Sequence, residues 1–298
     1  MGARYADRVV IVTGGSSGIG KGCAYEFVRA GARVVVCCNE DEGGRAVARD
    51  LQELARESGS GEGFFVYCDV TKEEDVRRLV ETTVERYGRL DCLINNAGWH
   101  PPHKPIDDFS VEEFRSLLEL NLVSVFTACK AALPHLRRVR GNIINMSSLV
   151  AQIGQRHATT YVATKGALTA FTKALALDEA AGGVRVNSVS PGNIFTPLWR
   201  EAADAAPDPE RFLEEGKAAQ AMGRLGTAEE VGRLCLFIAA EATFTTGADH
   251  VISGGAELGY GNKNGHEEAA GEAAFVRGPA ASPGTAADTY LTESRSGD

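Results

Sequence analysis

The sequence predicts an α/β fold in which a doubly wound parallel sheet of about seven strands is covered by helices on both faces. Short runs rich in β-branched residues alternate with longer stretches of helical periodicity along most of the chain. The strand-like runs are apolar almost throughout, which is typical of parallel strands buried on both faces. With 298 residues and 44% hydrophobic content, the chain can bury one large core or two modest ones. The regular alternation favours a single domain.

The predicted strands are all short, as expected where longer crossover segments connect parallel neighbours. They are Arg8 to Val12, Arg33 to Cys38, Gly63 to Tyr67, Cys92 to Asn95, Asn142 to Met146, Arg185 to Ser190 and His250 to Ile252. Apolar residues at helical spacing predict helices between them. These are Ile19 to Ala30, Arg45 to Glu57, Lys72 to Arg86, Val111 to Leu136, Thr160 to Glu179 and Ala228 to Ala240.

The chain changes character after residue 261. From Asn262 onward it is rich in Ala, Gly, Ser, Thr and Glu. Such a composition buries too little apolar surface to offset the entropy lost on ordering. Residues 1–261 are therefore predicted to form the domain, and residues 262–298 a disordered tail.

Charge and cysteine usage exclude several classes of partner. The net charge of −9 gives no reason to expect nucleic acid or an anionic membrane as a partner. The seven cysteines are scattered without a CxxC pair, which predicts buried, reduced thiols in a cytoplasmic protein.

No targeting segment is visible, and no apolar stretch approaches the ~20 residues that a membrane-spanning helix needs.

A glycine-rich motif lies where the first strand ends and the first helix begins. It reads Thr13-Gly14-Gly15-Ser16-Ser17-Gly18-Ile19-Gly20, with the spacing T-G-x-x-x-G-x-G instead of the usual G-x-G-x-x-G. Glycines permit a tight turn and let backbone N–H groups approach a pyrophosphate, while the helix N-terminus adds a partial positive charge. The position after a strand favours nucleotide binding over a simple turn.

Tyr161 and Lys165 are four residues apart within a predicted helix, so the phenol and the ammonium project from one face roughly 6 Å apart. A cation that close favours the phenolate and is expected to lower the pKa of Tyr161 from its usual value near ~10. Such a tyrosine can act as an acid or base near neutrality. Alone, the spacing is common by chance, and a surface aromatic beside a solvated lysine is the alternative.

Taken together, the motifs resemble the short-chain dehydrogenase/reductase family in order and spacing, over about residues 5 to 260. Besides the glycine motif, the resemblance rests on Asp69-Val70, Asn95-Asn96-Ala97-Gly98, Asn121, Ser148, Tyr161, Lys165 and Pro191-Gly192. It implies a Rossmann-type fold, a nicotinamide cofactor and assembly as a homotetramer. Four stretches are similar to members of the family that oxidise 17-beta-hydroxysteroids or L-fucose: Tyr161 to Gly166, Pro191 to Ile194, Thr196 to Trp199 and Gly254 to Gly261.

The resemblance also implies the catalytic roles. Tyr161 is the base, Lys165 holds the nicotinamide ribose and keeps the phenolate accessible, and Ser148 hydrogen-bonds the substrate oxygen. Asn121 looks like a fourth member that supports a water-linked proton relay. Ser147 competes for the serine role, but Ser148 has the family's thirteen-residue spacing to Tyr161. Adjacent serines on an extended segment face opposite sides.

The position at the end of the second strand bears on cofactor choice. NAD-binding folds commonly place an acid there to hold the ribose hydroxyls. Here Cys38 occupies it, followed by Asn39, which could bond the ribose, and by Glu40 and Asp41, which disfavour a nearby phosphate. NAD is predicted over NADP. Asp69 would accept from the adenine amino group, cap the following helix, or do both. The expected cofactor residues are Gly14, Ser17, Gly18, Ile19, Gly20, Cys38, Asn39, Asp69, Val70, Asn95, Tyr161, Lys165, Ile194, Thr196 and Leu198.

Substrate residues are expected outside the carboxyl ends of the strands. The candidates are Trp99, His100, Ser148, Gln155, Asn193, Trp199 and Tyr260. The tryptophans suit a flat apolar ligand such as estradiol, whereas His100, Gln155 and Asn193 suit a sugar such as L-fucose, so both substrates stay open. Tyr260, past the last strand, could instead reach a neighbouring subunit.

Two further features are open to a functional or a structural interpretation. The segment from Pro197 to Met222 is interpreted as a lid over the substrate or as a surface helical insertion. His100 and His103 flank two prolines without a third donor at a recognisable spacing, so no metal site is predicted.

The predicted function is NAD-dependent oxidation of a secondary alcohol to a ketone or lactone. Two alternatives remain: an NADPH-dependent carbonyl or 3-oxoacyl reductase, and a catalytically idle nucleotide-binding scaffold on the same fold. The complete set of Asn121, Ser148, Tyr161 and Lys165 favours the enzyme, because a scaffold needs none of them.

Overall fold

The computed structural model describes residues 4–259 and contains the predicted seven-stranded sheet. The strands lie in the order β3-β2-β1-β4-β5-β6-β7, and every neighbouring pair is parallel. Strand order reverses direction between β1 and β4, which is where doubly wound sheets bind their ligands. The strands are β1 (Val9–Thr13), β2 (Arg33–Cys38), β3 (Glu62–Tyr67), β4 (Cys92–Asn95), β5 (Asn142–Met146), β6 (Arg185–Pro191) and β7 (Asp249–Ile252).

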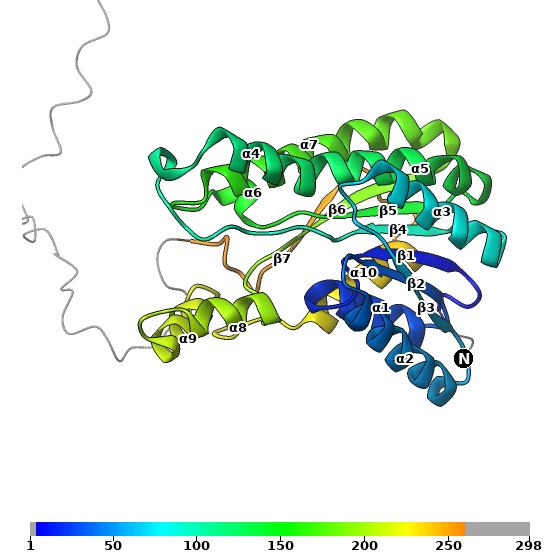
Figure 1. Ribbon diagram of the computed structural model, residues 1–298, viewed down its shortest axis with the longest axis horizontal. Helices are drawn as coiled ribbons and strands as arrows, with labels where there is room; N and C mark the ends of the chain where they lie inside the picture. The colour runs from blue at the N-terminus through cyan, green and yellow to red at the C-terminus, as the bar shows by residue number, and fades with distance from the viewer. Residues whose placement is uncertain (1–3, 260–298) are drawn as a thin grey trace, which may run out of the picture. The chain divides into compact units, whose positions relative to one another are not determined.

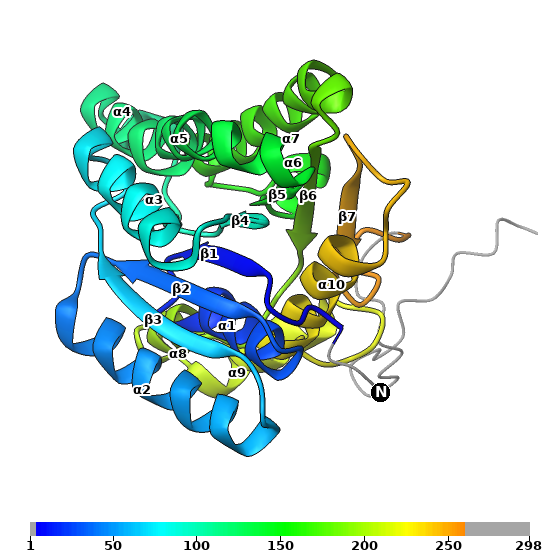
Figure 2. The same cartoon turned by 90° about the vertical axis from the view of Figure 1, so that its right-hand side faces the viewer.

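Helices cover both faces of the sheet, as the apolar strands predict (Figure 1). One layer holds α1 (Gly18–Arg29), α2 (Asp41–Ser58) and α10 (Ala228–Ala240), and the other holds α3 (Glu73–Tyr87), α5 (Ser124–Val139) and α7 (Thr159–Glu179). Figure 2 shows the sheet between the two layers. Short elements complete the chain: α4 (Val111–Leu118), α6 (Val150–Ile153), α8 (Pro197–Asp204), α9 (Pro209–Ala218) and the 3-10 turns Ile106–Asp108 and Ala180–Gly182.

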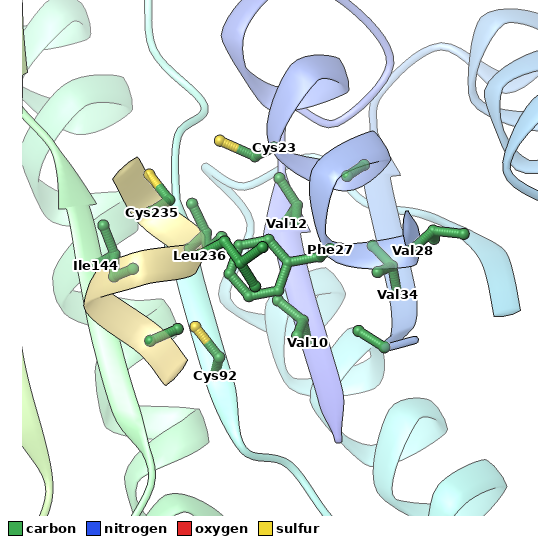
Figure 3. Packing of buried hydrophobic residues seen from close by; sticks show 14 of the residues in the cluster. Val10, Val12, Cys23, Phe27, Val28, Val34, Cys92, Ile144, Cys235 and Leu236 are labelled. Atoms are coloured by element: carbon green, nitrogen blue, oxygen red, sulfur yellow. The ribbon is translucent and has the colours of Figure 1, made fainter. Parts of the chain in front are cut away.

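Two apolar cores, one on each face of the sheet, hold the layers together. Figure 3 shows the core under α1 and α10, where Phe27 of α1 points toward Leu236 of α10 and Val10 of β1. Both Phe27 and Val10 are fully buried. Burying a side chain of this size stabilises the fold by ~1.5 to 3 kcal/mol, so the two cores fix the strand ends where the site residues begin.

The predicted helix from Val111 to Leu136 is interrupted. A π-helical turn, Glu119–Val123, separates α4 from α5, and it carries Asn121. The apolar periodicity continues across the turn, so periodicity alone gave one uninterrupted helix. The helical stretch Val111–Val139 is also long and apolar enough to cross a membrane by length and composition. Its buried residues pack on the sheet, which makes it a core element here.

Candidate active site

The glycine-rich turn joins β1 to α1 and leaves room for a ligand. Gly14 has φ +61°, a left-handed conformation that favours glycine, and a Cβ at Gly20 would collide with the Gly14 carbonyl oxygen. The helix begins at Gly18 without an acidic residue in its first turn, and Ser17 at the N-cap makes no capping bond. Ile19 is partly buried against the core. The free amides and the helix dipole fit the pyrophosphate of a dinucleotide.

Asn96, to which we assigned no role from the sequence, ties this turn to the end of β4. Its Nδ2 donates to the carbonyl oxygens of Thr13 at 3.0 Å and Gly14 at 3.1 Å. The Thr13 hydroxyl accepts from the backbone amides of Asn96 and Ala97 at 3.0 Å each. These bonds fix the shape of the turn before any ligand arrives.

Asn95 lies where predicted in the chain, but its side chain does not line the site. Its Nδ2 donates to Asn145 Oδ1 at 2.9 Å and lies 3.4 Å from Cys129 Sγ, so the amide is buried inside the fold. The expectation that Asn95 faces the nicotinamide is therefore corrected for its side chain. Side-chain direction alternates along a strand, and β4 turns this amide toward β5 and α5.

The end of β2 presents a thiol and an amide where an acid is common. Cys38 donates its Sγ–H to the Glu40 carbonyl oxygen at 3.0 Å, and Asn39 is exposed. The Glu40 carboxylate caps α2 by accepting from the amides of Glu42 at 2.8 Å and Gly43 at 2.5 Å. Because Glu40 is occupied by its own helix, Asn39 is the polar side chain best placed to meet a ribose.

Asp69 closes a turn before α3 but does not cap that helix, whose N-cap is Lys72 and which has no side-chain capping bond. Its Oδ1 accepts from the Thr71 hydroxyl at 2.7 Å and the Thr71 amide at 3.1 Å, and these bonds lower the pKa of Asp69. Val70 is partly buried and packs on the core. Contact of either residue with adenine stays a prediction.

The structure brings Ser148, Tyr161 and Lys165 together at the ends of β5 and α7. Lys165 is buried, and its Nζ donates to the Met146 carbonyl oxygen at 2.8 Å. The Ser148 side chain lies beside the Tyr161 phenol and acts to lower the pKa of Tyr161. Ser147 instead donates to the Lys165 carbonyl oxygen at 3.0 Å and is buried. The two serines thus face opposite sides, as their adjacency predicts.

The pKa of Tyr161 corrects one expectation. Burial raises it to about 12, and Ser148 acts in the opposite direction without overcoming burial. Lys165 does not lower it as expected, because its Nζ lies 5.8 Å from the ring centroid and is directed at the Met146 carbonyl. Burial also lowers the pKa of Lys165 to about 8. At pH 7 the site holds a neutral phenol and a mostly protonated lysine.

Asn121 connects the loop after β4 to α7. Its Oδ1 accepts from the Trp99 amide at 2.9 Å, and its Nδ2 donates to the Trp99 carbonyl at 3.0 Å and to Thr164 Oγ1 at 3.1 Å. The buried Thr164 donates in turn to the Tyr161 carbonyl at 2.8 Å. Thr164, which sequence patterns did not indicate, therefore links two predicted site residues. π-helical turns such as the one carrying Asn121 often occur at functional sites.

His100 and Gln155 meet over the phenol. The imidazole lies on the Tyr161 ring with centroids 4.1 Å apart, and its Nε2 lies 3.0 Å from Gln155 Oε1. Its Nδ1 lies 2.6 Å from the Pro101 carbonyl oxygen, so Nδ1 carries a proton if that contact is a hydrogen bond. His100 thus packs on the ring of Tyr161, and Gln155 reaches the site through its contact with His100.

The segment after β6 approaches the glycine turn. Ile194 is buried and bridges to Gly226, and Thr196 caps α8 by accepting from the Trp199 amide at 3.4 Å. The Thr196 methyl lies beside Gly18, while Leu198 is exposed. A cofactor wall formed by Ile194, Thr196 and Leu198 stays a prediction.

Other predicted substrate residues have structural partners or lie elsewhere. Asn193 Nδ2 donates to the Gly216 carbonyl of α9 at 2.9 Å, and Trp199 packs on Phe212 with ring centroids 5.2 Å apart. Both therefore hold α8 and α9 together. Trp99 is 49% exposed and free to meet a ligand. Tyr260 and the tail from 262 to 298 lie outside the described residues.

No group of three or more potential metal ligands occurs within residues 4–259. The site offers instead a phenol, a hydroxyl and an ammonium beside a turn shaped for a dinucleotide. These are the groups needed to move a proton and position a hydride acceptor at one carbon.

Comparison with known proteins decides the family. A family model described as enoyl-(acyl carrier protein) reductase matches residues 14–257. The chain belongs to the short-chain dehydrogenase/reductase family. The L-fucose dehydrogenase of Bos taurus is 54% identical over 279 residues, covering 94% of this chain and 98% of that protein. The chain is accordingly an oxidoreductase that acts on CH–OH groups with a nicotinamide cofactor.

Two solved structures support the same conclusion. The aldohexose dehydrogenase of Thermoplasma acidophilum, in ligand-free form, has a TM-score of 0.77 at 32% identity, over 87% of this chain and 98% of that chain. The L-sorbose reductase of Gluconobacter frateurii, complexed with NADPH and L-sorbose, has a TM-score of 0.81 at 29% identity. The match covers 87% of this chain and 100% of that chain. Both agree with the predicted Rossmann-type fold.

Proposed function

We propose that this chain is an NAD-dependent dehydrogenase that oxidises a sugar, L-fucose, at its anomeric C1–OH to give a lactone. The observation that carries the proposal is the pair of polar side chains over the phenol, with His100 Nε2 3.0 Å from Gln155 Oε1. A polyhydroxylated substrate can replace this contact with its own hydroxyls. The 54% identity to L-fucose dehydrogenases supports the same substrate.

The residues divide the chemistry between a proton and a hydride. Tyr161 takes the hydroxyl proton, and Ser148 hydrogen-bonds the substrate oxygen as charge develops on it. Lys165 supplies a positive charge beside the phenol and, in the proposal, holds the cofactor ribose. Asn121 keeps the loop at Trp99 in place. The nicotinamide, held by the glycine turn and the segment from Ile194 to Leu198, supplies the hydride acceptor.

The preference for NAD rests on the residues after β2. Neither Cys38 nor Asn39 carries a positive charge, and a 2′-phosphate is best held by an arginine or lysine. Asn39, exposed at the strand end, is the side chain proposed to bond the ribose hydroxyls. The nearby Glu40 and Asp41 add negative charge that repels a phosphate.

A steroid is the second candidate substrate. Trp99 is 49% exposed and Leu198 45%, so apolar surface is available near the site for a flat ligand. Estradiol would contact these side chains through its rings and present one hydroxyl to Tyr161.

Initial rates distinguish these proposals. L-fucose and estradiol are each assayed with NAD and with NADP, and an acyl thioester ketone is assayed with NADPH. We expect the highest kcat/KM for L-fucose with NAD. A hundredfold preference for NADP would overturn the cofactor assignment, and activity confined to the thioester would overturn the substrate assignment. NADH binding without turnover of any substrate would favour the scaffold alternative.

We also propose a homotetramer that works in the cytoplasm. Phe126 on α5 is 52% exposed, Val123 39% and Leu177 on α7 80%, which leaves apolar surface on the two helices expected to form subunit contacts. Size-exclusion chromatography with light scattering measures the mass. A monomer at micromolar concentration would contradict the tetramer.

A further inference from the structure

A cavity lies at the opposite end of the sheet from Ser148, Tyr161 and Lys165. It has a volume of about 490 Å³ and lies beside the first residues of β5 and β6 and the last residues of α10. Four arginines, Arg8, Arg89, Arg140 and Arg185, line it together with one carboxylate, Asp91. A lining of four cations and one anion stands out in a chain whose net charge is −9.

The single carboxylate is already occupied. Asp91 is buried, and its two oxygens accept from Arg89 at 2.8 and 2.5 Å, while Oδ2 also accepts from the Val9 amide at 2.9 Å. Asp91 therefore neutralises Arg89 and anchors β1. It forms no ion pair with the other three arginines among the described residues.

Arg185 is partly buried without an anionic partner. Its guanidinium donates to the carbonyl oxygens of Ala242 at 3.0 Å and Ala239 at 3.1 Å. Burial lowers the pKa of Arg185; Cys92 and Tyr5 act to raise it, and the nearby charge of Arg8 acts to lower it. A carbonyl dipole compensates a buried cation less well than an anion does.

Arg8 and Arg140 are also unpaired within residues 4–259. Arg8 lies over the Tyr5 ring, 4.9 Å from its centroid, and neither arginine forms an ion pair with a carboxylate. The acidic residues that neighbour the lining along the chain pair with other cations, since Asp7 pairs with Arg33, Glu241 with Arg4 and Glu179 with Arg137. The arginine cavity, defined by Arg8, Arg140 and Arg185, thus keeps three positive charges without counter-charges.

We propose that the arginine cavity binds a small polyanion that carries phosphate groups, at a site separate from the cofactor. Guanidinium forks match phosphate oxygens in geometry as well as charge. The volume is larger than a single phosphate ion needs, which favours a diphosphate or a phosphorylated metabolite over the orthophosphate ion. The cavity opens to solvent on one side, so a phosphorylated small molecule can enter it from solution. The inference is independent of the proposed dehydrogenase activity.

Isothermal titration calorimetry tests it with inorganic pyrophosphate as the probe. The full chain is first saturated with NADH, so that the glycine turn is occupied, and low ionic strength limits screening. We expect saturable binding of pyrophosphate. Arg140→Gln and Arg185→Gln should each weaken it about tenfold, because each removes one charge-assisted contact.

Arg138→Gln is the matched control, since Arg138 is exposed on the same helix two residues before Arg140 and does not line the cavity. It should change the Kd by less than about twofold, the size of a long-range charge effect at a solvent-exposed site. If Arg185→Gln does not fold, the Kd of the Arg140→Gln variant still tests the proposal, because Arg140 is exposed. Absence of binding, an equal Kd in wild type and Arg140→Gln, or loss of binding on NADH saturation would overturn the proposal.

Discussion

The imidazole of His100 lies on the phenol of Tyr161, with ring centroids 4.1 Å apart and planes tilted by 43°. Among the aromatic ring pairs of residues 4–259, this is the one that involves Tyr161. The histidine therefore shields one face of the catalytic ring and carries a polar edge to Gln155. In the proposed function, His100 would both orient Tyr161 and recognise a hydroxylated substrate.

Replacing His100 with phenylalanine separates these roles. His100→Phe keeps an aromatic ring on Tyr161 but removes the nitrogen that faces Gln155. We expect KM for L-fucose to rise about tenfold, the effect of one lost hydrogen bond to a substrate hydroxyl, with a smaller change for estradiol. Steady-state kinetics measure both. His103→Phe, on the same loop with its ring 5.1 Å from that of His100, is the control. Equal effects of the two variants would refute the assignment.

Tyr161→Phe tests the base. Removing the hydroxyl leaves the ring packed but no group to take the substrate proton, and we expect kcat to fall by about 10² to 10⁴ or more. NADH binding, followed by fluorescence, should stay within about threefold, since the glycine turn is untouched. Retained turnover would remove Tyr161 from the mechanism.

The pH dependence of oxidation follows from the raised pKa of Tyr161. A phenol with a pKa of about 12 is protonated at neutral pH, so the proton-accepting form becomes more abundant as pH rises. We expect kcat for oxidation to increase from pH 6 toward pH 10, and kcat for the reverse reduction to decrease. Initial rates in both directions measure this. A flat profile for oxidation would show that another group takes the proton.

The serine pair gives a matched comparison. Ser148→Ala removes the hydroxyl beside the phenol and should lower kcat by about 10² to 10³ with little change in stability. Ser147→Ala removes a buried bond to the Lys165 carbonyl, and we expect a loss of about 1 kcal/mol in unfolding free energy with most activity kept. Urea denaturation measures the stability of both variants, and steady-state kinetics measure their kcat. The reverse pattern would assign catalysis to Ser147.

Lys165→Met should abolish activity and stabilise the ligand-free protein at pH 7. Burial lowers the pKa of Lys165 from 10.5 to about 8, so the folded state holds the charged form less well than the unfolded state does. At ~1.4 kcal/mol per pKa unit, the charged lysine lowers the free energy of unfolding by an amount on the order of 3 kcal/mol. Loss of the bond to Met146 reduces the net gain to ~1 to 2 kcal/mol.

This gain has a defined pH range. The destabilisation by Lys165 is fully present below pH 8 and disappears as pH rises through 10.5, where the lysine is neutral in both states. Urea denaturation at pH 7 and at pH 10.5 measures it. A variant less stable than wild type at pH 7 would contradict the role of burial.

Much of the fold could be predicted because its signals are local. Continuous apolar strands such as Val9–Thr13 indicate burial on both faces, and the parallel sheet that they predict is confirmed. The interruption at Glu119–Val123 could not be predicted, because apolar spacing continues through it. Within this turn, Asn121 bonds to Trp99, which lies 22 residues away along the chain.

The sequence by itself indicated which groups carry the chemistry, since Ser148, Tyr161 and Lys165 match the family pattern in order and spacing together with the other motifs. Tertiary structure alone decided their electrostatics and their neighbours. Burial, set by the packing of α7 on the sheet, reverses the expected direction of the Tyr161 pKa. His100 packs on the phenol of Tyr161, and unpaired arginines gather around one cavity. Both arrangements depend on contacts between segments that are distant in the chain, which residue spacing does not encode.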